Sequence, residues 1–290
     1  MGGFLRRHKR VIPYALLAPG LLWLVFFYVL PGFQMLLTSF WSGTLETGYE
    51  FALSNVSNYS DALVKYSAQF GRSILYGGLA TLLTFAISYP LAYTIAFRGG
   101  RYKNLLLFLV VAPFFTSFLL RTISWKIIFS DNGMILGPLK DIGLLPESFR
   151  LLATPIAVIA GITYNFLPFM TLPIYVSLEK IDKRLVEAAE DLFATGFGAF
   201  RRITLPLSLP GVFAGSLLTF IPAMGDYVNA ELLGNPQTTM IGNVIQNQFL
   251  TQNNFPTASA LSFILMAGIL IAVAVYARLL GTDELTSGGV

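Results

Sequence analysis

Six long apolar runs constrain the fold of this chain more than any other feature of its sequence. A transmembrane helix needs about 20 predominantly apolar residues, and the runs reach or approach that length. They lie at residues 14–37, 73–97, 105–129, 151–177, 205–224 and 258–280. Hydrophobic residues make up 55% of the 290 positions and charged residues 12%, which leaves too little polar surface to cover a soluble globule. We therefore predict an all-α polytopic membrane protein with six transmembrane helices in one transmembrane domain, residues 1–290.

The positions of the Lys and Arg residues predict how these spans are oriented. With a cytoplasmic N-terminus, most of the 19 basic residues fall in inner segments. The outer segments then hold Lys65, Arg72, Lys140 and Arg150. This bias predicts that both termini are cytoplasmic. The basic residues at positions 6–10 precede an apolar run that is too long for a cleaved signal peptide, so we expect that run to be an anchor and the first span.

The longest strongly charged stretch between two apolar runs is residues 179–211, with five acidic and five basic residues. At 3.6 residues per turn, its first part would form an amphipathic helix whose acidic residues point away from the apolar face. That face carries Leu185, Ala188, Ala189 and Leu192. We expect Gly196 and Gly198 to break this helix. The prediction is a short helix, a turn and a second helix that enters the membrane.

Two parts of this stretch resemble the EAA motif of the membrane subunits of bacterial ABC importers. The motif residues are Glu187, Ala188, Ala189, Ile203, Leu205 and Pro206. The resemblance implies the type I importer (MetI-like) fold and a coupling loop, residues 179–204, that docks in a cleft of a cytoplasmic ATPase. The residues it implies for this contact are Glu187, Ala188, Ala189, Asp191, Leu192, Phe193 and Gly196. On spacing alone, the stretch fits a solvated charged loop between two membrane helices as well.

One position departs from the family pattern. Phe193 stands where the family has a glycine, which puts the geometry of the turn in question. The nearby glycines at 196 and 198 offer another way to make the bend.

The three outer segments carry more acidic than basic residues, and the last of them contains no Lys or Arg at all. Such a field attracts cations, and aromatic faces beside carboxylates hold them well. The predicted substrate path therefore includes Asp226, Tyr227, Glu231, Trp125 and Tyr164. The alternative is that a positive-inside topology by itself removes basic residues from outer loops.

Two basic residues lie inside the third apolar run. Arg121 and Lys126 are costly at membrane depth unless they are paired or solvated. We predict a structural ion pair there, with Asp131 or Asp226 as the acid.

Small residues and prolines predict how the other spans pack. Gly211 and Gly215 predict a close approach between helices, and Pro168 and Pro173 predict an interrupted or kinked fourth span. The first outer segment, residues 38–72, is rich in turn-forming residues. We expect irregular structure with short amphipathic helices there, forming a docking surface.

A wider resemblance extends from about Pro13 to Leu280. The segments that carry it are PAMGDYVNAELLG, MIGNVIQNQF, NNFPTASA, SFLLRTISW and DNGMILG. They resemble the membrane subunits of spermidine/putrescine importers, and related subunits for iron, thiamine, phosphonate or opines share parts of the first segment. The resemblance implies a prokaryotic cytoplasmic membrane, a homologous second membrane subunit, two copies of a cytoplasmic ATPase and an external substrate-binding protein.

The residues present argue against other function classes, namely an ATPase, an intramembrane enzyme, a channel and a secondary transporter. The chain has no GxxxxGK[ST] run, so we expect ATP and Mg²⁺ on the partner ATPase and no cofactor, catalytic residue or nucleic acid on this chain. It has no cysteine and one histidine, His8, which argues against a metal site or an intramembrane enzyme. A channel or secondary transporter usually shows intramembrane acids or an inverted repeat, and neither is evident in the apolar runs.

Overall fold

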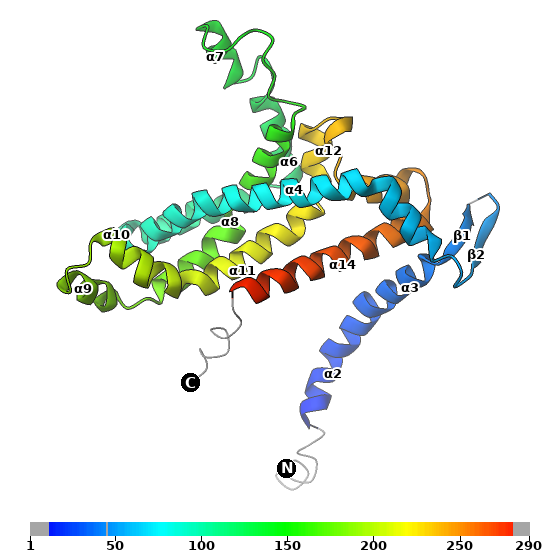
Figure 1. Ribbon diagram of the computed structural model, residues 1–290, viewed down its shortest axis with the longest axis horizontal. Coiled ribbons are helices and arrows are strands. Elements are labelled where there is room, and N and C mark those ends of the chain that lie inside the picture. Colours follow the sequence, from blue (N-terminus) through cyan, green and yellow to red (C-terminus); the bar gives the residue numbers. More distant parts are fainter. Residues whose placement is uncertain (1–11, 45, 281–290) are drawn as a thin grey trace. The chain divides into compact units, whose positions relative to one another are not determined.

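The computed structural model describes residues 12–44 and 46–280, and His8 with the basic N-terminal residues lies outside this part. The chain divides into two compact units. The smaller unit combines Met1–Lys65 with Asn247–Ile264, and the larger unit combines Tyr66–Gln246 with Leu265–Val290. The helices and strands, most of them labelled in Figure 1, are α2 (Ile12–Leu24), α3 (Leu30–Thr38), β1 (Trp41–Thr44), β2 (Gly48–Phe51), α4 (Ser57–Tyr93), α5 (Lys103–Val111), α6 (Phe118–Ile128), α7 (Leu136–Asp141), α8 (Pro155–Glu179), α9 (Lys183–Asp191), α10 (Gly196–Ala199), α11 (Leu205–Met224), α12 (Val228–Leu233), α13 (Ile241–Gln246) and α14 (Phe255–Leu280).

Five helical segments of the described chain are long and apolar enough to cross a bilayer. They are Leu16–Thr38, Ser57–Arg98, Pro155–Glu179, Gly196–Met224 and Phe255–Arg278. A sixth span is present if the bent pair Gly100–Phe115 and Phe118–Ile128 counts as one. The predicted helical, multi-spanning architecture is therefore confirmed.

The third apolar run forms two helices rather than one straight span. The helical segments that contain α5 and α6 are bent by 94° at the break between them. Pro113 lies in the 3₁₀ turn that follows α5, and Thr116 is extended, with φ −101° and ψ 143°. Proline donates no backbone hydrogen bond, and an extended residue ends the helical ladder, so α6 starts in a new direction at Phe118.

The core of the larger unit is formed by α4 from Tyr66 onward, α8 and α11, which run side by side (Figure 1). The glycines of α11 allow the predicted close approach. A Cβ atom at Gly211 would lie 2.5 Å from the carbonyl oxygen of Pro173, and one at Gly215 would lie 3.0 Å from that of Met170. Helix α8 continues through Pro168 and Pro173 without a break. The sequence prediction of a glycine-mediated contact is confirmed.

Buried hydroxyl groups join these three helices. The Thr171 hydroxyl donates to Ser88 Oγ at 2.9 Å, and the Ser88 hydroxyl donates to the Leu167 carbonyl at 3.2 Å. The hydroxyl groups of Tyr89 and Ser208 lie 2.8 Å apart. The apolar residues buried around them are Ala92, Met170, Ile174, Leu178, Ile181 and Val212. This packing holds α4, α8 and α11 together as far as the C-terminal end of α8, where the charged loop begins.

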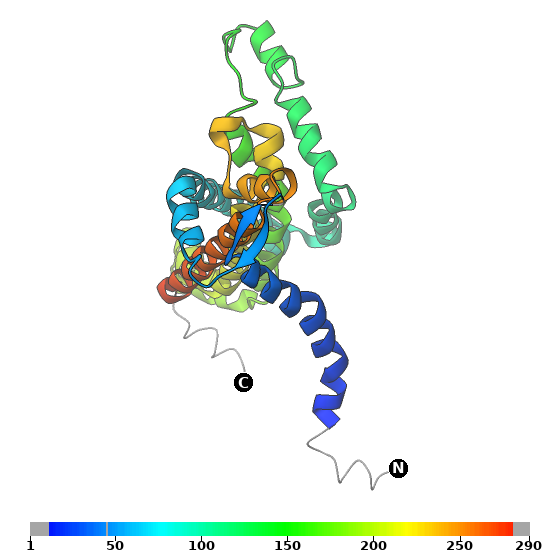
Figure 2. The same ribbon diagram turned by 90° about the vertical axis from the view of Figure 1, so that its right-hand side faces the viewer.

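The smaller unit contains a two-stranded antiparallel hairpin that the sequence did not predict (Figure 2). Strands β1 and β2 pair with Trp41 opposite Phe51 and Thr44 opposite Gly48. The ring of Tyr49 lies 5.7 Å from that of Trp41, and its hydroxyl donates to the Asn253 carbonyl at 2.5 Å. The expectation of irregular structure in residues 38–72 was therefore wrong for this part, because alternate aromatic residues support strand pairing.

Candidate coupling loop and outer polar cluster

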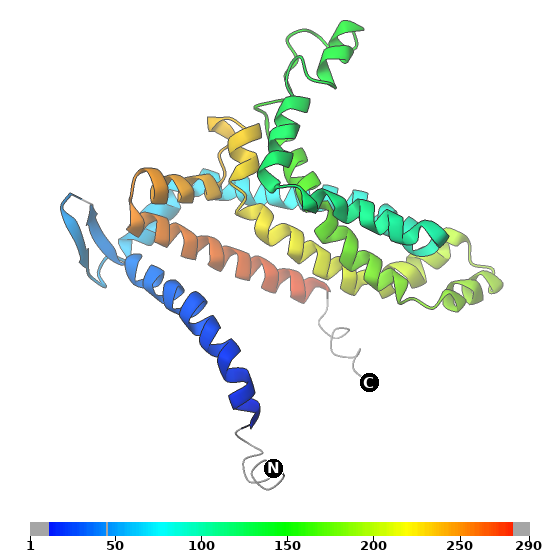
Figure 3. The same ribbon diagram turned by 180° about the vertical axis from the view of Figure 1, so that it is seen from behind.

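The charged stretch forms the predicted helix–turn–helix arrangement. Helix α9 follows α8 after a short turn, and the Asp182 carboxylate accepts from the Arg184 backbone N–H at 3.0 Å at its start. Helix α10 then leads through a π-helical turn into α11, so the loop continues directly into a membrane-spanning segment. Figure 3 shows α9 at the end of the larger unit where α8 and α11 meet the loop.

Helix α9 ends at Asp191, and the turn that follows is made at Phe193, not at the later glycines. Phe193 has a φ of +62°, a left-handed conformation that favours glycine and is rare for a bulky residue. The Ala194 N–H donates to the Ala189 carbonyl at 3.0 Å, which is the Schellman pattern of a helix C-terminus. Gly196 and Gly198 lie inside α10, where the Thr195 hydroxyl caps the helix by accepting from the Gly198 N–H at 3.1 Å. The prediction that these glycines make the break was wrong.

The loop exposes apolar side chains at its turn. Phe193 is 98% exposed, Leu192 80% and Phe197 73%. Around them, Glu187, Ala188, Asp191 and Gly196 are exposed and Ala189 is half-buried. A hollow of about 590 Å³ next to this patch is lined by Phe193, Ala194, Thr195, Phe197, Gly198, Arg201 and Arg202. Contiguous exposed apolar side chains rimmed by charges are typical of a protein-binding surface.

A second group of polar residues is buried. We call Thr122 of α6, Asn165 of α8, Asn229 of α12 and Asp226 before α12 the outer polar cluster, after the side of the membrane that the sequence predicts for it. Asn165 Nδ2 donates to Asn229 Oδ1 at 3.1 Å and to the Thr122 hydroxyl at 3.2 Å. The Thr122 hydroxyl donates to Asn229 Oδ1 at 3.3 Å. The side-chain amide of Asn229 thus links α12 to α6 and α8, because its oxygen accepts from both Thr122 and Asn165. Asn229 was not among the predicted site residues. A polar side chain beside an apolar run was the available signal.

Asp226 is held by Asn229 on both carboxylate oxygens. The Asn229 backbone N–H donates to one oxygen at 2.9 Å, and its side-chain amide donates to the other at 2.6 Å. Asp226 is buried, and burial raises the pKa of its carboxyl, although the hydrogen bonds from Asn229 act in the opposite direction. Its oxygens are therefore engaged within the chain rather than presented at the surface.

The other predicted path residues lie around this cluster in different environments. The rings of Trp125 and Tyr164 are in contact, with centroids 5.1 Å apart at 67°. Tyr227 is 43% exposed. Glu231 is exposed and accepts from Asn243 Nδ2 at 3.2 Å. The structure thus joins the two rings to each other and binds each carboxylate to a different asparagine.

Arg121 does not form the predicted ion pair. Its side chain is buried, and its guanidinium lies 5.0 Å from the ring centre of Phe114 and 5.8 Å from that of Phe118. Within the described residues, its Nε and Nη1 atoms have no hydrogen-bond partner. Asp131 pairs instead with Lys140 and Arg150, each at 3.5 Å. One turn of α6 separates Arg121 from Phe118, so the helix directs the cation toward aromatic faces rather than toward an acid. Lys126, the other predicted cation, is exposed.

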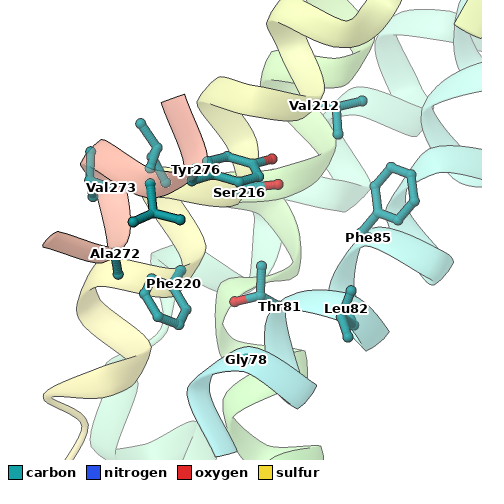
Figure 4. Close-up of a pocket in the computed structure, with 12 residues that line it drawn as sticks. Gly78, Thr81, Leu82, Phe85, Val212, Ser216, Phe220, Ala272, Val273 and Tyr276 are labelled. Carbon is teal, nitrogen blue, oxygen red and sulfur yellow. The ribbon is translucent and has the colours of Figure 1, made fainter. Parts of the chain in front are cut away.

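A separate groove of about 620 Å³ lies between α4, α11 and α14 of the larger unit (Figure 4). Its walls are apolar apart from the hydroxyl groups of Thr81, Ser216 and Tyr276. No charged side chain is among the residues that line it. The groove therefore lacks the carboxylates that would hold a cation, and it is distinct from the outer polar cluster.

Comparison with known proteins agrees with this architecture. Residues 88–280 match the family model "Binding-protein-dependent transport system inner membrane component". The chain is 40% identical over 257 residues to the spermidine/putrescine transport system permease protein PotB of Haemophilus influenzae, covering 88% of this chain and 90% of that protein. It is 38% identical over 258 residues to PotB of Escherichia coli strain K12, covering 88% and 93%.

Solved structures show the same fold. A bacterial ABC transporter for import of the acidic polysaccharide alginate superposes with a TM-score of 0.76 at 20% identity, covering 96% of this chain and 98% of that one. The MetNI methionine ABC transporter in an inward-facing conformation superposes with a TM-score of 0.57 at 19% identity, covering 77% and 97%.

The spans and the loop between the fourth and fifth of them define a membrane permease of the ABC importer class with the MetI-like fold. The chain belongs to the family of binding-protein-dependent transport system inner membrane components. It is a multi-pass, non-catalytic membrane subunit.

Proposed function

We propose that this chain is the permease subunit of an ATP-driven polyamine importer and that it carries spermidine or putrescine. The similarity to the PotB proteins over most of the chain supports the substrate class. The excess of acidic residues in the outer segments suits a cationic substrate. Exposed Tyr227 and Glu231, with the Trp125–Tyr164 ring pair, supply the aromatic and acidic groups such a path needs.

The single observation that carries the coupling role is the exposed apolar turn of α9. A chain on its own gains nothing from presenting Leu192, Phe193 and Phe197 to water, so these side chains are expected to be covered by a partner. We propose that this partner is a cytoplasmic ATPase, present in two copies, which binds ATP and Mg²⁺. A second homologous permease and an external substrate-binding protein complete the transporter, and both termini of this chain lie inside a prokaryotic cytoplasmic membrane.

The packing supplies a route from the loop to the outer polar cluster. Helix α10 continues into α11, and α11 touches α8 closely at Gly211. Helix α8 also carries Asn165, which bonds to Thr122 of α6 and Asn229 of α12. A displacement of the loop by the ATPase therefore moves helices that end at the proposed path. The substrate biases this exchange only through its different affinity for the two states.

The coupling role is tested with Glu187→Lys, which reverses an exposed charge on α9. Expected is a loss of uptake by at least about tenfold in the assembled transporter, with normal membrane insertion, because charge reversal at an interface costs more than about 1.4 kcal/mol. Arg98→Glu is the control, since it reverses an exposed charge on the same predicted side but outside the loop. If the Glu187→Lys transporter is present at normal levels and takes up substrate at the wild-type rate, the proposed coupling role is wrong.

The substrate is tested on the same reconstituted transporter. Uptake of radiolabelled spermidine is measured with its external binding protein against unlabelled spermidine, putrescine, thiamine, iron, phosphonates and opines as competitors. Competition by the two polyamines alone is expected. Competition by thiamine, iron, a phosphonate or an opine with an equal or lower midpoint would replace the polyamine assignment and leave the coupling role in place.

A further inference from the structure

The cytoplasmic turn between the second and third spans is tied to the coupling loop by one side chain. Lys103 is the first residue of α5, and its ammonium donates to the carboxylate of Glu179, the last residue of α8. The Lys103 Nζ atom also lies 5.5 Å from the ring centre of Tyr175, one turn earlier on α8. Helix α9 begins at Lys183, so this contact sits at the first residue of the coupling loop, just before α9.

Neither charge suits its own helix. The N-terminal end of a helix is the positive end of its dipole and favours acids, whereas the C-terminal end favours bases. Lys103 opens α5 and Glu179 closes α8, so each residue carries the disfavoured sign. Their pairing offsets both unfavourable placements. The two charges are therefore favourable only through the contact between the helices, because neither is favoured by its own helix.

The pair adds little to folding stability by itself. The side chains of Lys103 and Glu179 are 28% and 42% exposed, and ion pairs exposed to that degree are largely screened by solvent. The pair instead fixes the position of the end of α8 relative to the start of α5. Just beyond it, Ile181 is buried against the core of α4, α8 and α11, so the start of the coupling loop is anchored on one side by apolar packing and on the other by Lys103.

We propose that Lys103 is a positioning residue for coupling, which makes the third span move with the end of α8 when the ATPase displaces the loop. This inference rests on the proposed coupling function of the loop. Without Lys103, displacement of the loop reaches α8 and α11 but is transmitted less completely to α5. Because the segment after α5 leads to α6, which carries Trp125 and Thr122, the outer part of the path then responds less to each ATP hydrolysed.

The test uses the complete transporter in proteoliposomes, with ATP hydrolysis and spermidine uptake measured in the same vesicles. Lys103→Gln is expected to lower the number of molecules imported per ATP by about threefold, the size typical of side chains that modulate coupling between sites. The melting temperature is expected to stay unchanged. Arg101→Gln is the matched control, because Arg101 lies in the same turn but stacks on Tyr102, at 4.7 Å from its ring centre.

Exchanging the two charges between positions 103 and 179 tests whether the ion pair itself is needed, or only a lysine at position 103. Lys103→Glu combined with Glu179→Lys restores the pair with its direction reversed and places each charge at the helix end that favours it. This double variant is expected to recover most of the import per ATP that Lys103→Gln loses. Glu179→Gln is expected to reproduce the defect of Lys103→Gln, and it serves as the second single variant if Lys103→Gln does not assemble.

Three outcomes would overturn the inference: an unchanged ratio in both single variants, no recovery in the double variant, or a lower melting temperature with an unchanged ratio. Glu187→Lys measured in parallel distinguishes this failure from that of the proposed function. If Glu187→Lys uncouples transport and the Lys103 variants do not, only the positioning role is wrong. If Glu187→Lys also leaves transport normal, the loop itself has no coupling role and the inference falls with it.

Discussion

The coupling loop and the outer polar cluster use polar residues in opposite ways. In the cluster, Asp226, Asn229 and Asn165 are buried and bonded to one another, and both oxygens of Asp226 are occupied. In the loop, charged residues such as Glu187 and Asp191 lie in solvent together with apolar side chains such as Phe193. The cluster satisfies most of its polar atoms within this chain, whereas the loop leaves apolar side chains exposed for the proposed partner to cover.

This difference predicts that the cluster contributes to the stability of the folded chain and that the loop contributes to its association with a partner. Buried polar groups are costly unless they are hydrogen-bonded, so changes in the cluster should be felt by the fold of the isolated chain. Exposed apolar groups gain their burial energy on association, so changes in the loop should be felt by the complex. The three predictions below test that separation, starting with the largest expected effect on stability.

The largest effect is expected for Asn229→Leu. This change removes the amide that both caps Asp226 and accepts from Asn165, leaving buried polar groups without partners. The chain should lose about 3 kcal/mol of stability, measured by thermal unfolding in detergent. Asn104→Leu, at an exposed position, is the control and should have little effect. Equal stabilities of the two variants would show that the cluster does not hold its helices together.

A smaller effect is expected for Gly211→Ala, which tests the packing that links the two regions. The new methyl group would lie 2.4 Å from Ser177 Oγ and 2.5 Å from the Pro173 carbonyl oxygen, and both belong to α8. The helices must separate, which should cost about 1–3 kcal/mol and lower uptake. Gly78→Ala is the matched control, because a Cβ atom there has no neighbour within 4 Å. A normal melting temperature and normal uptake for Gly211→Ala would argue against this link.

The smallest effect on stability is expected at Phe193. Asparagine adopts the left-handed conformation more readily than phenylalanine, so Phe193→Asn keeps the turn and removes the exposed ring. The melting temperature should stay the same or rise slightly, while affinity for the ATPase should fall about tenfold, as for loss of an interface anchor. The affinity is measured by titrating the purified ATPase onto the permease in nanodiscs. Unchanged affinity, or a clear loss of stability, would contradict the assignment of the loop to assembly.

Several features of the fold followed from local sequence alone. The length of the apolar runs gives the number of candidate spans, because bilayer thickness sets how many residues must be apolar. The 3.6-residue period of Leu185, Ala188 and Leu192 gives α9. Gly211 and Gly215 predicted the contact between α11 and α8, because only a missing side chain allows backbones so close.

Other features required the tertiary structure. Arg121 was expected to meet an acid and instead lies over Phe114, because the direction of a side chain depends on how α6 turns after the bend. The helix break was expected at Gly196 and occurs at Phe193, because the backbone of α9 closes a Schellman turn there despite the unfavourable residue. Local propensity therefore pointed to the glycines, whereas the backbone hydrogen bond that closes the turn places the left-handed residue at Phe193.

The sequence by itself determined that this chain spans a membrane and carries an amphipathic, charged loop between two spans, since both properties depend on composition and short-range period. It could not determine which side chains meet. Lys103 and Glu179 are separated by 76 positions, and Thr122 and Asn229 by 107. Whether such distant residues touch depends on the rotation and crossing of the helices, which the packing of the whole unit decides and no local pattern records.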